Sequence, residues 1–461
     1  MHAVAEWLYD HSPVLVQNLL TNLYGLKVYR QRYGGAFSEY RTLLAQYEAL
    51  PREEQDRIQL TRLRDLVAYA IEKSPFYRRL YGDLDAGDIK TLEDLRALPL
   101  VTKDMLRENI DAVITIPSQK AAVWHTGGTT GKSLVGYATR ENAQERMATL
   151  AHFKAKHGFV HGKMRRATFN GKHIVPPGYK GNVFWRSNLS IRQRIYSSFH
   201  LTQDNLPLYI EDIRRFRPHS LDGFPSSILE VAGYIERHGL SLGYTPVAVF
   251  PTSETVTPEV RATIERAFGC PVRDQYASSE GAPFVTECPL GQLHYDTFSG
   301  IIEPREQGSP EILVTSFTSY GTPLIRYAIG DAMEFAPPDE ICDCGNNTPL
   351  VRSIQGRSSD YLVRADGGKV IAANLANVLK NLPNSVIRTQ FVQDRLGEVI
   401  VKLVVDRDRF ESAQAQRLLD ELAHKFGRGT EFVLYLVDDI PREASGKHRL
   451  VKNMIGDSTH V

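Results

Sequence analysis

The first part of the chain, to about residue 95, carries its apolar residues at helical spacing. The clearest example is REEQDRIQLTRLRDLVAYAIEKS, residues 52–74. Its apolar positions near the helical period are Ile58, Leu60, Leu63, Leu66, Val67 and Ile71. A helix with one apolar stripe must pack against another element, so we expect this segment to extend or wrap a larger body.

Beyond a Thr/Gly-rich loop at 126–131, β-like and helical pieces alternate to about residue 335. The β-like pieces are SLDGF (220–224), VAVFPTS (247–253), VRDQYASSE (272–280) and EILVTSF (311–317). A helical stretch, TPEVRATIERAFG (257–269), lies between two of them. This alternation is typical of an α/β layer structure.

The pattern changes after IQGRSSDYLV (354–363). A β-like VIVKLVVD (399–406), a helical stretch at 411–427 and a β-like FVLYLVDDIP (432–441) follow in a short space. The chain has 461 residues, more than the ~250–300 that one core usually serves. We therefore predict an α/β protein with a large multi-layer N-terminal domain at 1–355, including a helical extension at about 1–95, and a small α/β C-terminal domain at 356–461.

Composition fits an ordinary globular protein, with 42% apolar and 24% charged residues. Lys plus Arg number 55 against 54 Asp plus Glu, so the chain as a whole has no field that would recruit nucleic acid or an acidic membrane. Any anionic ligand must be held locally.

The compartment is indicated by the N-terminus and the cysteines. Charged residues such as Glu6 and Asp10 interrupt the apolar start, unlike a signal peptide, and no run of about 18 apolar residues follows. Four cysteines are too few for the disulfide framework of a secreted protein. We expect a cytoplasmic protein with no stable membrane insertion, and its oligomeric state stays open.

The loop HTGGTTGKSL (125–134) suggests phosphate chemistry. A Walker A P-loop needs a glycine five positions before Gly131, and this chain has Thr126 there. The Walker-B-like FVLYLVDD (432–439) is about 300 residues away, in the other predicted domain. A P-loop ATPase therefore matches the loop poorly.

Five motifs in order give a better match. They are HTGGTTGKSL, YASSEGA (276–282), YGTPLIRYAIGD (320–331), GRSSDYLV (356–363) and IPREASGKHRL (440–450). Together they resemble the adenylate-forming superfamily of acyl-CoA synthetases, peptide-synthetase adenylation domains and luciferases. The chain is most similar to the phenylacetate-CoA ligase-like family, in particular its members associated with capsular polysaccharide genes. LDGFPSSI (221–228) and the N-terminal stretch extend the resemblance to nearly the whole chain.

The resemblance implies an ATP- and magnesium-dependent ligase. A carboxylic acid would attack the α-phosphate of ATP, release pyrophosphate and form an acyl-adenylate, whose acyl group would then pass to coenzyme A. It also implies that the small domain is a mobile lid that rotates between the two steps, with a pivot just after Arg357. Here the pivot reads Ser358, Ser359 and Asp360, where many members place a charged residue at the middle position, so the pivot residue and the need for a full rotation stay open.

Site residues follow from the resemblance. The loop over the β- and γ-phosphates would be Thr126, Gly127, Gly128, Thr129, Thr130 and Gly131, with Lys132 either on phosphate or in solvent. Thr130, Glu280 and Lys447 would be catalytic: Glu280 as the magnesium ligand, and Lys447 as the cation that bridges the carboxylate and the α-phosphate. A surface turn and solvated side chains are the ordinary alternatives.

The adenosine half of ATP would meet a second set. Gln275, Tyr276, Ala277 and Ser278 would border the adenine and acyl pockets. Asp331 would accept hydrogen bonds from the ribose hydroxyls, and Arg357 would reach the ribose or a phosphate. Ser253 and Glu254 would line the adenine, although an ordinary strand-to-helix cap explains them nearly as well.

A zinc site is a further candidate. Cys288 and His294 flank a short turn, and Cys342 and Cys344 form a C-x-C pair, which together offer four ligands for a tetrahedral structural site. Related sequences carry a comparable set, and ordinary buried cysteines are the alternative. Cys270 is interpreted as a core residue.

The acid and its acceptor are less defined. The segment 169–200, which would build the acyl pocket, is rich in Lys, Arg and His. It favours a polar or anionic acid, or an acceptor larger than coenzyme A, unless the charges form a solvated face. The alternatives are an amide ligase that joins the acid to an amine on an amino acid or amino sugar, and a non-catalytic nucleotide- or acyl-binding homologue. Retention of Glu280, Asp331 and Lys447 argues against the last.

Overall fold

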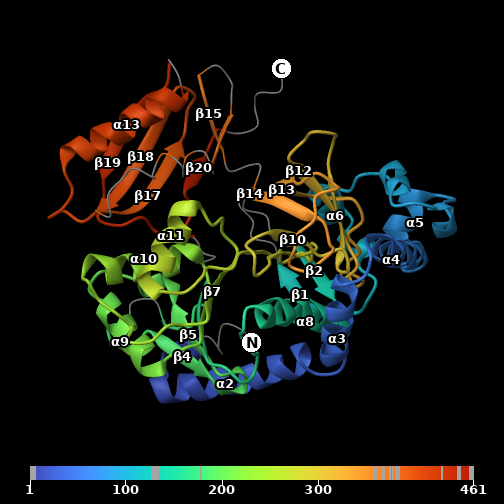
Figure 1. Cartoon of the computed structure of the whole chain (residues 1–461), viewed down its shortest axis with the longest axis horizontal. Coiled ribbons are helices and arrows are strands. Elements are labelled where there is room, and N and C mark those ends of the chain that lie inside the picture. The colour runs from blue at the N-terminus through green and yellow to red at the C-terminus, as the bar shows by residue number, and fades with distance from the viewer. Residues whose placement is uncertain are drawn as a thin grey trace. The chain divides into compact units, whose positions relative to one another are not determined.

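The computed structural model describes residues 7–125, 134–176, 179–357, 361–365, 369–372, 375, 378, 385–426, 429–443 and 448–455. It divides into two compact units, each assembled from three separate segments (Figure 1). Unit 1 comprises Met1–Arg165, Ser187–Gln193 and Arg273–Ile354, and unit 2 comprises Arg166–Arg186, Arg194–Val272 and Gln355–Val461.

Helices dominate the first segment of unit 1, as the apolar spacing predicted. They are α2 (Val14–Arg32), α3 (Phe37–Glu48), α4 (Arg52–Lys73), α5 (Pro75–Tyr81), α6 (Lys103–Glu108), α7 (Ile110–Val113) and α8 (Arg140–Lys156). Short 3₁₀ turns are η1 (Ala86–Asp88), η2 (Glu93–Ala97), η3 (Ser118–Lys120) and, in the second segment, η4 (Leu189–Ile191). Helix α4 ends at Ser74, whose side chain accepts a hydrogen bond from the Tyr77 N–H and so starts α5 with Pro75 at its first position.

The third segment of unit 1 forms a seven-stranded sheet in the order β11-β12-β13-β14-β10-β9-β8. Its strands are β8 (Gln275–Tyr276), β9 (Val285–Glu287), β10 (Leu293–Tyr295), β11 (Gly300–Pro304), β12 (Glu311–Ser316), β13 (Tyr327–Phe335) and β14 (Leu350–Arg357). Buried residues of α4, among them Leu63 and Leu66, share one core with Ile302 and Val314 of this sheet. A separate antiparallel pair, β1 (Ala122–His125) and β2 (Val135–Ala138), flanks the predicted phosphate loop.

Unit 2 contains a five-stranded sheet in the order β4-β5-β3-β6-β7. The strands are β3 (Arg166–Asn170), β4 (Trp185–Asn188), β5 (Gln193–Ser197), β6 (Ser220–Gly223) and β7 (Ala248–Pro251), and the helices are η5 (Ser198–His200), α9 (Leu206–Phe216), α10 (Pro225–Arg237) and α11 (Pro258–Phe268). Strands β3, β6 and β7 run parallel, so their carboxyl ends meet at one edge. At that edge Gly223 has φ 128°, and a Cβ there would lie 1.7 Å from the Phe169 carbonyl oxygen, which only glycine avoids.

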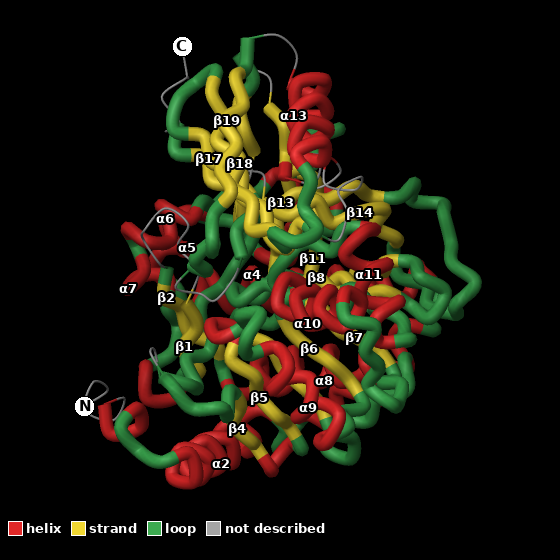
Figure 2. Tube along the Cα trace, turned by 90° about the vertical axis from the view of Figure 1, so that its left-hand side faces the viewer, coloured by secondary structure: helices red, strands yellow, loops and turns green. Residues whose placement is uncertain are grey.

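The last part of unit 2 has its own sheet, in the order β19-β18-β17-β20, with α13 packed against it (Figure 2). The elements are β15 (Tyr361–Val363), β16 (Lys369–Ile371), β17 (Val386–Gln393), β18 (Glu398–Val405), α13 (Ser412–Phe426), β19 (Glu431–Leu436) and β20 (Val451–Asn453). Leu418, Leu422 and Phe426 of α13 share a core with Phe391 and Val401 of the sheet. The predicted strand, helix and strand of this region are confirmed to within a few residues.

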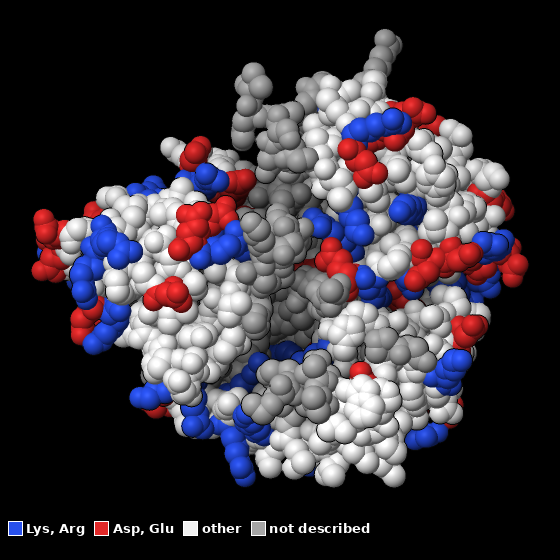
Figure 3. Space-filling model, turned by 180° about the vertical axis from the view of Figure 1, so that it is seen from behind, with Lys and Arg blue, Asp and Glu red and all other residues white. Residues whose placement is uncertain are grey.

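The fold as a whole is the mixed α/β architecture that the sequence predicted. None of the helices in the described ranges combines the length and the apolar character needed to cross a membrane. Acidic and basic side chains are interspersed over the face seen in Figure 3, in keeping with the near-zero net charge.

Candidate active site and metal cluster

Two of the predicted adenosine-binding residues contact each other in unit 1. The Tyr276 hydroxyl donates a hydrogen bond of 2.6 Å to Oδ2 of Asp331. Burial and the neighbouring carboxylate raise the pKa of Tyr276 well above its usual value of 10, so the hydroxyl stays protonated as the donor. Asp331 follows Gly330, which has φ 81°, inside β13. The contact joins two motifs that are 55 positions apart.

Arg146 of α8 holds the loop that carries Glu280. Its guanidinium donates to the carbonyl oxygens of Ser278 at 3.0 Å and Ala282 at 2.9 Å, and lies 4.3 Å from the centre of the Phe284 ring. Burial lowers the pKa of Arg146 to about 10, which still leaves it charged at neutral pH. Arg146 was not predicted from the sequence, because a single arginine on a helix with buried neighbours has no motif of its own.

The loop itself is internally bonded and buries the predicted magnesium ligand. Oγ of Ser278 accepts the N–H groups of Gly281 at 3.2 Å and Ala282 at 2.9 Å. The Glu280 side chain is buried and receives the Ser279 hydroxyl at 3.2 Å. A carboxylate oxygen in such a loop suits a hard cation such as Mg²⁺. Gln275 is buried in β8, and Ala277 follows that strand in a half-buried position.

Several predicted residues cannot be placed. The phosphate loop, Thr126, Gly127, Gly128, Thr129, Thr130 and Gly131 with Lys132, lies outside the described residues, as do Lys447 and the pivot residues Ser358, Ser359 and Asp360. The described ends of the loop are β1 and β2, where His125 pairs with Val135. Arg357 is the last residue of β14, and its side chain is not among the described parts.

Ser253 and Glu254 lie just beyond the carboxyl end of β7 in unit 2. Ser253 has φ 72°, a left-handed conformation that is unusual for a residue with a side chain. Neither residue caps the next helix, because Thr257 does so by accepting the Val260 N–H. The Glu254 carboxylate accepts the Ser226 N–H at 2.9 Å and the His448 N–H at 3.2 Å. Glu254 therefore holds the backbone immediately after Lys447.

A second carboxylate of unit 2 binds the C-terminal part of the chain. Glu230 of α10 is buried and pairs with Arg388 of β17 at 2.8 Å and with Arg442 at 2.7 Å. Arg388 also pairs with Asp439, and Arg442 donates to the Ser226 hydroxyl at 3.1 Å. A carboxylate shared by two arginines is satisfied on both oxygens, so the pairing fixes α10 to the predicted lid in this structure. No motif in the sequence marked Glu230.

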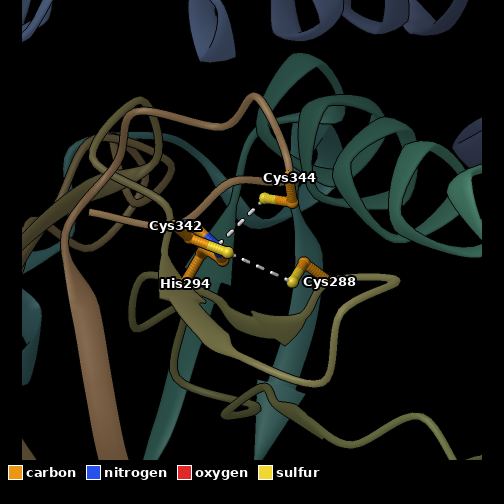
Figure 4. A group of neighbouring side chains, drawn as sticks. All are labelled: Cys288, His294, Cys342 and Cys344. Carbon is orange, nitrogen blue, oxygen red and sulfur yellow. Dashed lines mark hydrogen bonds between the residues drawn. The ribbon is translucent and has the colours of Figure 1, made fainter.

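The four predicted zinc ligands come together in unit 1 (Figure 4). Cys288 follows β9, His294 lies in β10, and Cys342 and Cys344 lie between β13 and β14. Their ligand atoms all lie within 4.8 Å of one another. The side chains point toward a common centre in Figure 4.

The distances suit a tetrahedral ion. The Sγ atoms of Cys288 and Cys342 are 3.8 Å apart, and Sγ of Cys344 is 3.3 Å from Nε2 of His294. Zn–S and Zn–N bonds of about 2.3 and about 2.0 Å give tetrahedral edges of roughly 3.8 and 3.5 Å. His294 Nδ1 lies 3.2 Å from the Thr348 carbonyl oxygen, which leaves Nε2 as the ligating nitrogen. Burial and the nearby thiols raise the pKa of Cys344 to about 12 without a metal, so a cation would be needed to hold this sulfur as a thiolate.

The basic segment 169–200 is not uniformly solvated. Arg186 is fully buried and donates to the Val183 and Trp185 carbonyl oxygens, and Arg194 pairs with Asp212 at 2.6 Å. These two arginines serve the local structure. Among the described residues of the segment, the exposed basic ones are Lys172, His173, Lys180 and Arg192.

Known proteins resemble the chain over nearly all of its length. A family model described as the CapK C-terminal domain matches residues 362–454. Protein CapK of Staphylococcus aureus is 35% identical, over 98% of this chain and 99% of that protein. The phenylacetate-coenzyme A ligase of Thermus thermophilus is 27% identical, over 88% of this chain and 98% of that protein. The similarity extends through both units.

A solved structure has the same fold. The crystal structure of 2-hydroxyisobutyryl-CoA ligase in the postadenylation state, in complex with R3-HIB-AMP, superposes with a TM-score of 0.71 and 19% identity. The match covers 89% of this chain and 91% of that one. At 19% identity, this similarity shows that the two proteins share a fold, and it assigns no activity or substrate to this chain.

Proposed function

Because the chain belongs to the CapK sub-branch of the phenylacetate-CoA ligase-like family of adenylate-forming enzymes, we propose that it is an AMP-forming ligase for a carboxylic acid. The acid would attack the α-phosphate of ATP, forming an acyl-adenylate and pyrophosphate. The acyl group would then pass to coenzyme A, a step supported by the relatives named phenylacetate-coenzyme A ligase. The family membership confirms the resemblance drawn from the five motifs.

One observation carries the proposal, the hydrogen bond between Tyr276 and Asp331. It fixes the orientation of a carboxylate beside the loop of Glu280, and a fixed carboxylate can accept both ribose hydroxyls of ATP. Preorganised groups of this kind lower the barrier because they need no rearrangement when the substrate binds. Gln275, Ala277 and Ser278 would border the adenine and acyl groups, and Ser253 would line the adenine.

The phosphates would be held by a second set of residues. We propose Thr126 to Gly131 as the loop over the β- and γ-phosphates, with Lys132 beside it and Thr130 touching the reacting phosphates. Glu280 would give one carboxylate oxygen to the magnesium ion, which offsets phosphate charge when bound. Arg357 would add a cation at the ribose or the α-phosphate.

Lys447 would neutralise the two anions that must approach each other, the acid and the α-phosphate. In a dry site this repulsion is a large part of the barrier. The contact between Glu254 and the His448 N–H places the neighbouring backbone. Glu254 is thus proposed as a positioning residue for Lys447 rather than as an adenine contact.

The zinc cluster is proposed to be structural. Four protein ligands leave no open position for a substrate, and they join the turn between β9 and β10 to the segment between β13 and β14. Bound zinc would brace this end of the sheet whose strands also carry Tyr276 and Asp331.

The test is product analysis across a panel of aryl, fatty and polar hydroxy or amino acids, each with ATP and magnesium, with and without coenzyme A. We expect AMP and pyrophosphate with one acid class and a rate that coenzyme A increases. If pyrophosphate release does not depend on coenzyme A but increases when an amine is added, the protein is an amide ligase instead. ADP as the product would indicate a P-loop ATPase, and nucleotide binding without turnover by any acid would indicate a non-catalytic homologue.

A further inference from the structure

Between Leu15 and Leu26, the apolar residues of helix α2 are exposed and its polar or small residues face the protein. The residues of α2 that are exposed and apolar form what we call the leucine face: Leu15, Val16, Leu19, Leu20, Leu23, Tyr24 and Leu26. Each has between 39 and 82% of its surface exposed. The inward positions are polar or small: Gln17, Asn18, Thr21, Asn22 and Gly25. This is the reverse of the usual amphipathic surface helix.

Hydrogen bonds from the polar side hold α2 in this orientation. The Ser187 N–H donates to Oδ1 of Asn18 at 2.8 Å, and the Leu189 N–H donates to Oδ1 of Asn22 at 2.7 Å. Nδ2 of Asn22 donates back to the Ser187 carbonyl oxygen at 3.0 Å. Rotating the helix to bury its leucines would break all three bonds, so the exposure of the leucine face is specified by the sequence.

Close packing at Gly25 supports the same orientation. A Cβ at Gly25 would lie 2.4 Å from Oδ1 of Asn188, so a side chain there would push the helix away. The inward side of α2 is therefore made to fit η4 and its neighbours.

The apolar surface extends beyond the helix at both sides. Trp7 and Leu8, which precede α2, are 57% and 54% exposed, and Leu189 at the start of η4 is 74% exposed. Monomeric proteins rarely leave contiguous apolar surface of this extent in water, because each buried apolar Å² is worth about 25 cal/mol. The leucine face is therefore suited to binding something.

Charge on α2 has one sign. The helix has no Asp or Glu, and its basic residues Lys27, Arg30 and Arg32 follow the leucine face at its C-terminal end. Asp10 is the acidic residue just before it.

We propose that α2 docks this protein on an anionic lipid surface, lying in the plane of the interface. An apolar face with leucines, aromatic rings at Trp7 and Tyr24, and basic residues next to it are the properties of interfacial helices. Indole and phenol groups favour the boundary between headgroups and chains. The polar inward face keeps the helix on the protein rather than across the membrane.

A second copy of the chain fits the same face less well. Two α2 helices packed side by side in parallel would place Lys27, Arg30 and Arg32 against the same cations of the partner. Packed antiparallel, these three cations would meet a start that carries two acids, Glu6 and Asp10, so the charges would not be fully matched. Anionic headgroups complement all three cations at once, each contributing to membrane affinity near the surface.

The experiment is flotation with vesicles of phosphatidylglycerol and phosphatidylcholine in equal parts, compared with phosphatidylcholine alone. The full chain should float with the anionic vesicles and at least tenfold less with the neutral ones. The triple variant Leu15→Glu, Leu19→Glu and Leu23→Glu should lose at least tenfold of the binding, and so should Lys27→Gln, Arg30→Gln and Arg32→Gln together. Leu396→Glu is the matched control, because Leu396 is 53% exposed outside the leucine face and should bind as the unmodified protein does.

Thermal unfolding checks that the variants fold, and unchanged midpoints are expected because every substituted side chain is exposed. Failure of the unmodified protein to float would overturn the proposal, as would full binding by the folded triple Glu variant. Light scattering without vesicles tests whether a second copy of the chain, rather than a lipid surface, covers the leucine face. A dimer that the triple Glu variant dissociates, in a protein that does not float, would assign the leucine face to a second copy.

Discussion

At the residue scale, the described residue next to Lys447 shows how the proposed catalytic lysine is supported. His448 donates its backbone N–H to Glu254, and Nε2 of its ring lies 2.8 Å from the Thr389 carbonyl oxygen. Both contacts are made within unit 2, one at the end of β7 and one on β17. His448, the residue directly after Lys447, is thus held at two points.

Replacing Lys447 by Ala should reduce adenylation at least roughly 1,000-fold, because the charge that offsets two approaching anions is lost. Formation of the thioester from a supplied acyl-adenylate should stay within a few-fold of normal. Pyrophosphate exchange and thioester formation, measured separately, check this. Lys402→Ala on β18 is the control, and equal loss of both half-reactions in Lys447→Ala would contradict the assigned role.

His448 should make stability depend on pH. Burial, followed by the charges of Arg442, Arg388 and Lys452, lowers its pKa from 6.5 to about 4. As the pH falls, the unfolded chain therefore takes up the proton before the folded chain does. The contribution of His448 to the free energy of unfolding is complete above pH ~6.5 and is lost as the pH falls toward 4. The largest possible loss is about 3 kcal/mol. Nδ1 has no partner among the described residues that could accept the added proton.

The measurement is the thermal midpoint of the unmodified protein and of His448→Gln between pH 7 and pH 4.5. Gln keeps a donor for the Thr389 carbonyl but does not titrate, so the two midpoints should converge as pH falls. Parallel curves would show that His448 does not titrate in this range. The comparison cancels the other histidines with lowered pKa values, His157, His200 and His294.

The sequence could predict some of these residues because motifs mark them. Tyr276 and Asp331 were named from two separate motifs, and the structure brings them within hydrogen-bond distance. Arg146, Glu230 and Arg388 were missed, since a charged residue on a helix or strand is usually solvated and only tertiary contacts show otherwise. Gly223 was missed for a related reason: the backbone of Phe169, far away in sequence, leaves no room for a Cβ there.

At the element scale, regular helices and strands were predicted where their apolar period was strong. Helices α4, α11 and α13 and strands β6, β7, β12 and β18 all lie where the pattern placed them. Helix α2 shows why periodicity alone did not reveal its environment. The same period fits a helix with leucines inward or outward, and the choice depends on Ser187 and Leu189, which are far away in sequence.

Loss of zinc should loosen one end of the seven-stranded sheet. We expect close to one zinc ion per chain in protein purified without chelator. The double variant Cys342→Ser and Cys344→Ser should bind less than a tenth of that amount, and its melting temperature should be at least about 5 °C lower. Metal analysis and thermal unfolding measure both. Cys270→Ala removes a buried thiol outside the cluster and should keep the metal; less than about half an equivalent in the unmodified protein would argue against a zinc site.

The pairing of α10 with β17 should depend on one carboxylate. Glu230→Gln leaves Arg388 and Arg442 without their shared partner in a buried place, a loss of about 3–5 kcal/mol. Hydrogen exchange of the β17 amides should rise roughly 100-fold or more. Glu236→Gln is the control on the same helix, because its partner Arg266 is largely exposed and the pair contributes about 1 kcal/mol or less. Equal exchange in the two variants would contradict the importance of the Glu230 pairs.

At the scale of the whole molecule, the family resemblance predicts a rotation between the two proposed steps, with its pivot after Arg357. Ser359→Pro fixes φ near −65° and removes an N–H, so it should restrict rotation there. We expect adenylation within about twofold of normal and transfer to coenzyme A at least tenfold slower, both measured by rapid quench. Ser359→Ala should be normal in both steps, and a normal transfer rate in Ser359→Pro would move the pivot elsewhere or remove the need for it.

The interleaving of the two units has a consequence for synthesis on the ribosome. Helix α4 of unit 1 is made well before the seven-stranded sheet of the same unit, which comes from residues 273–354. Gln59 of α4 therefore has no Tyr295 or Gly300 to bond until that segment has emerged, roughly 10–50 seconds later at ordinary elongation rates. During that interval the apolar stripe of α4 lacks its native sheet, so newly made chains should depend on chaperones that bind exposed helices early and release them late.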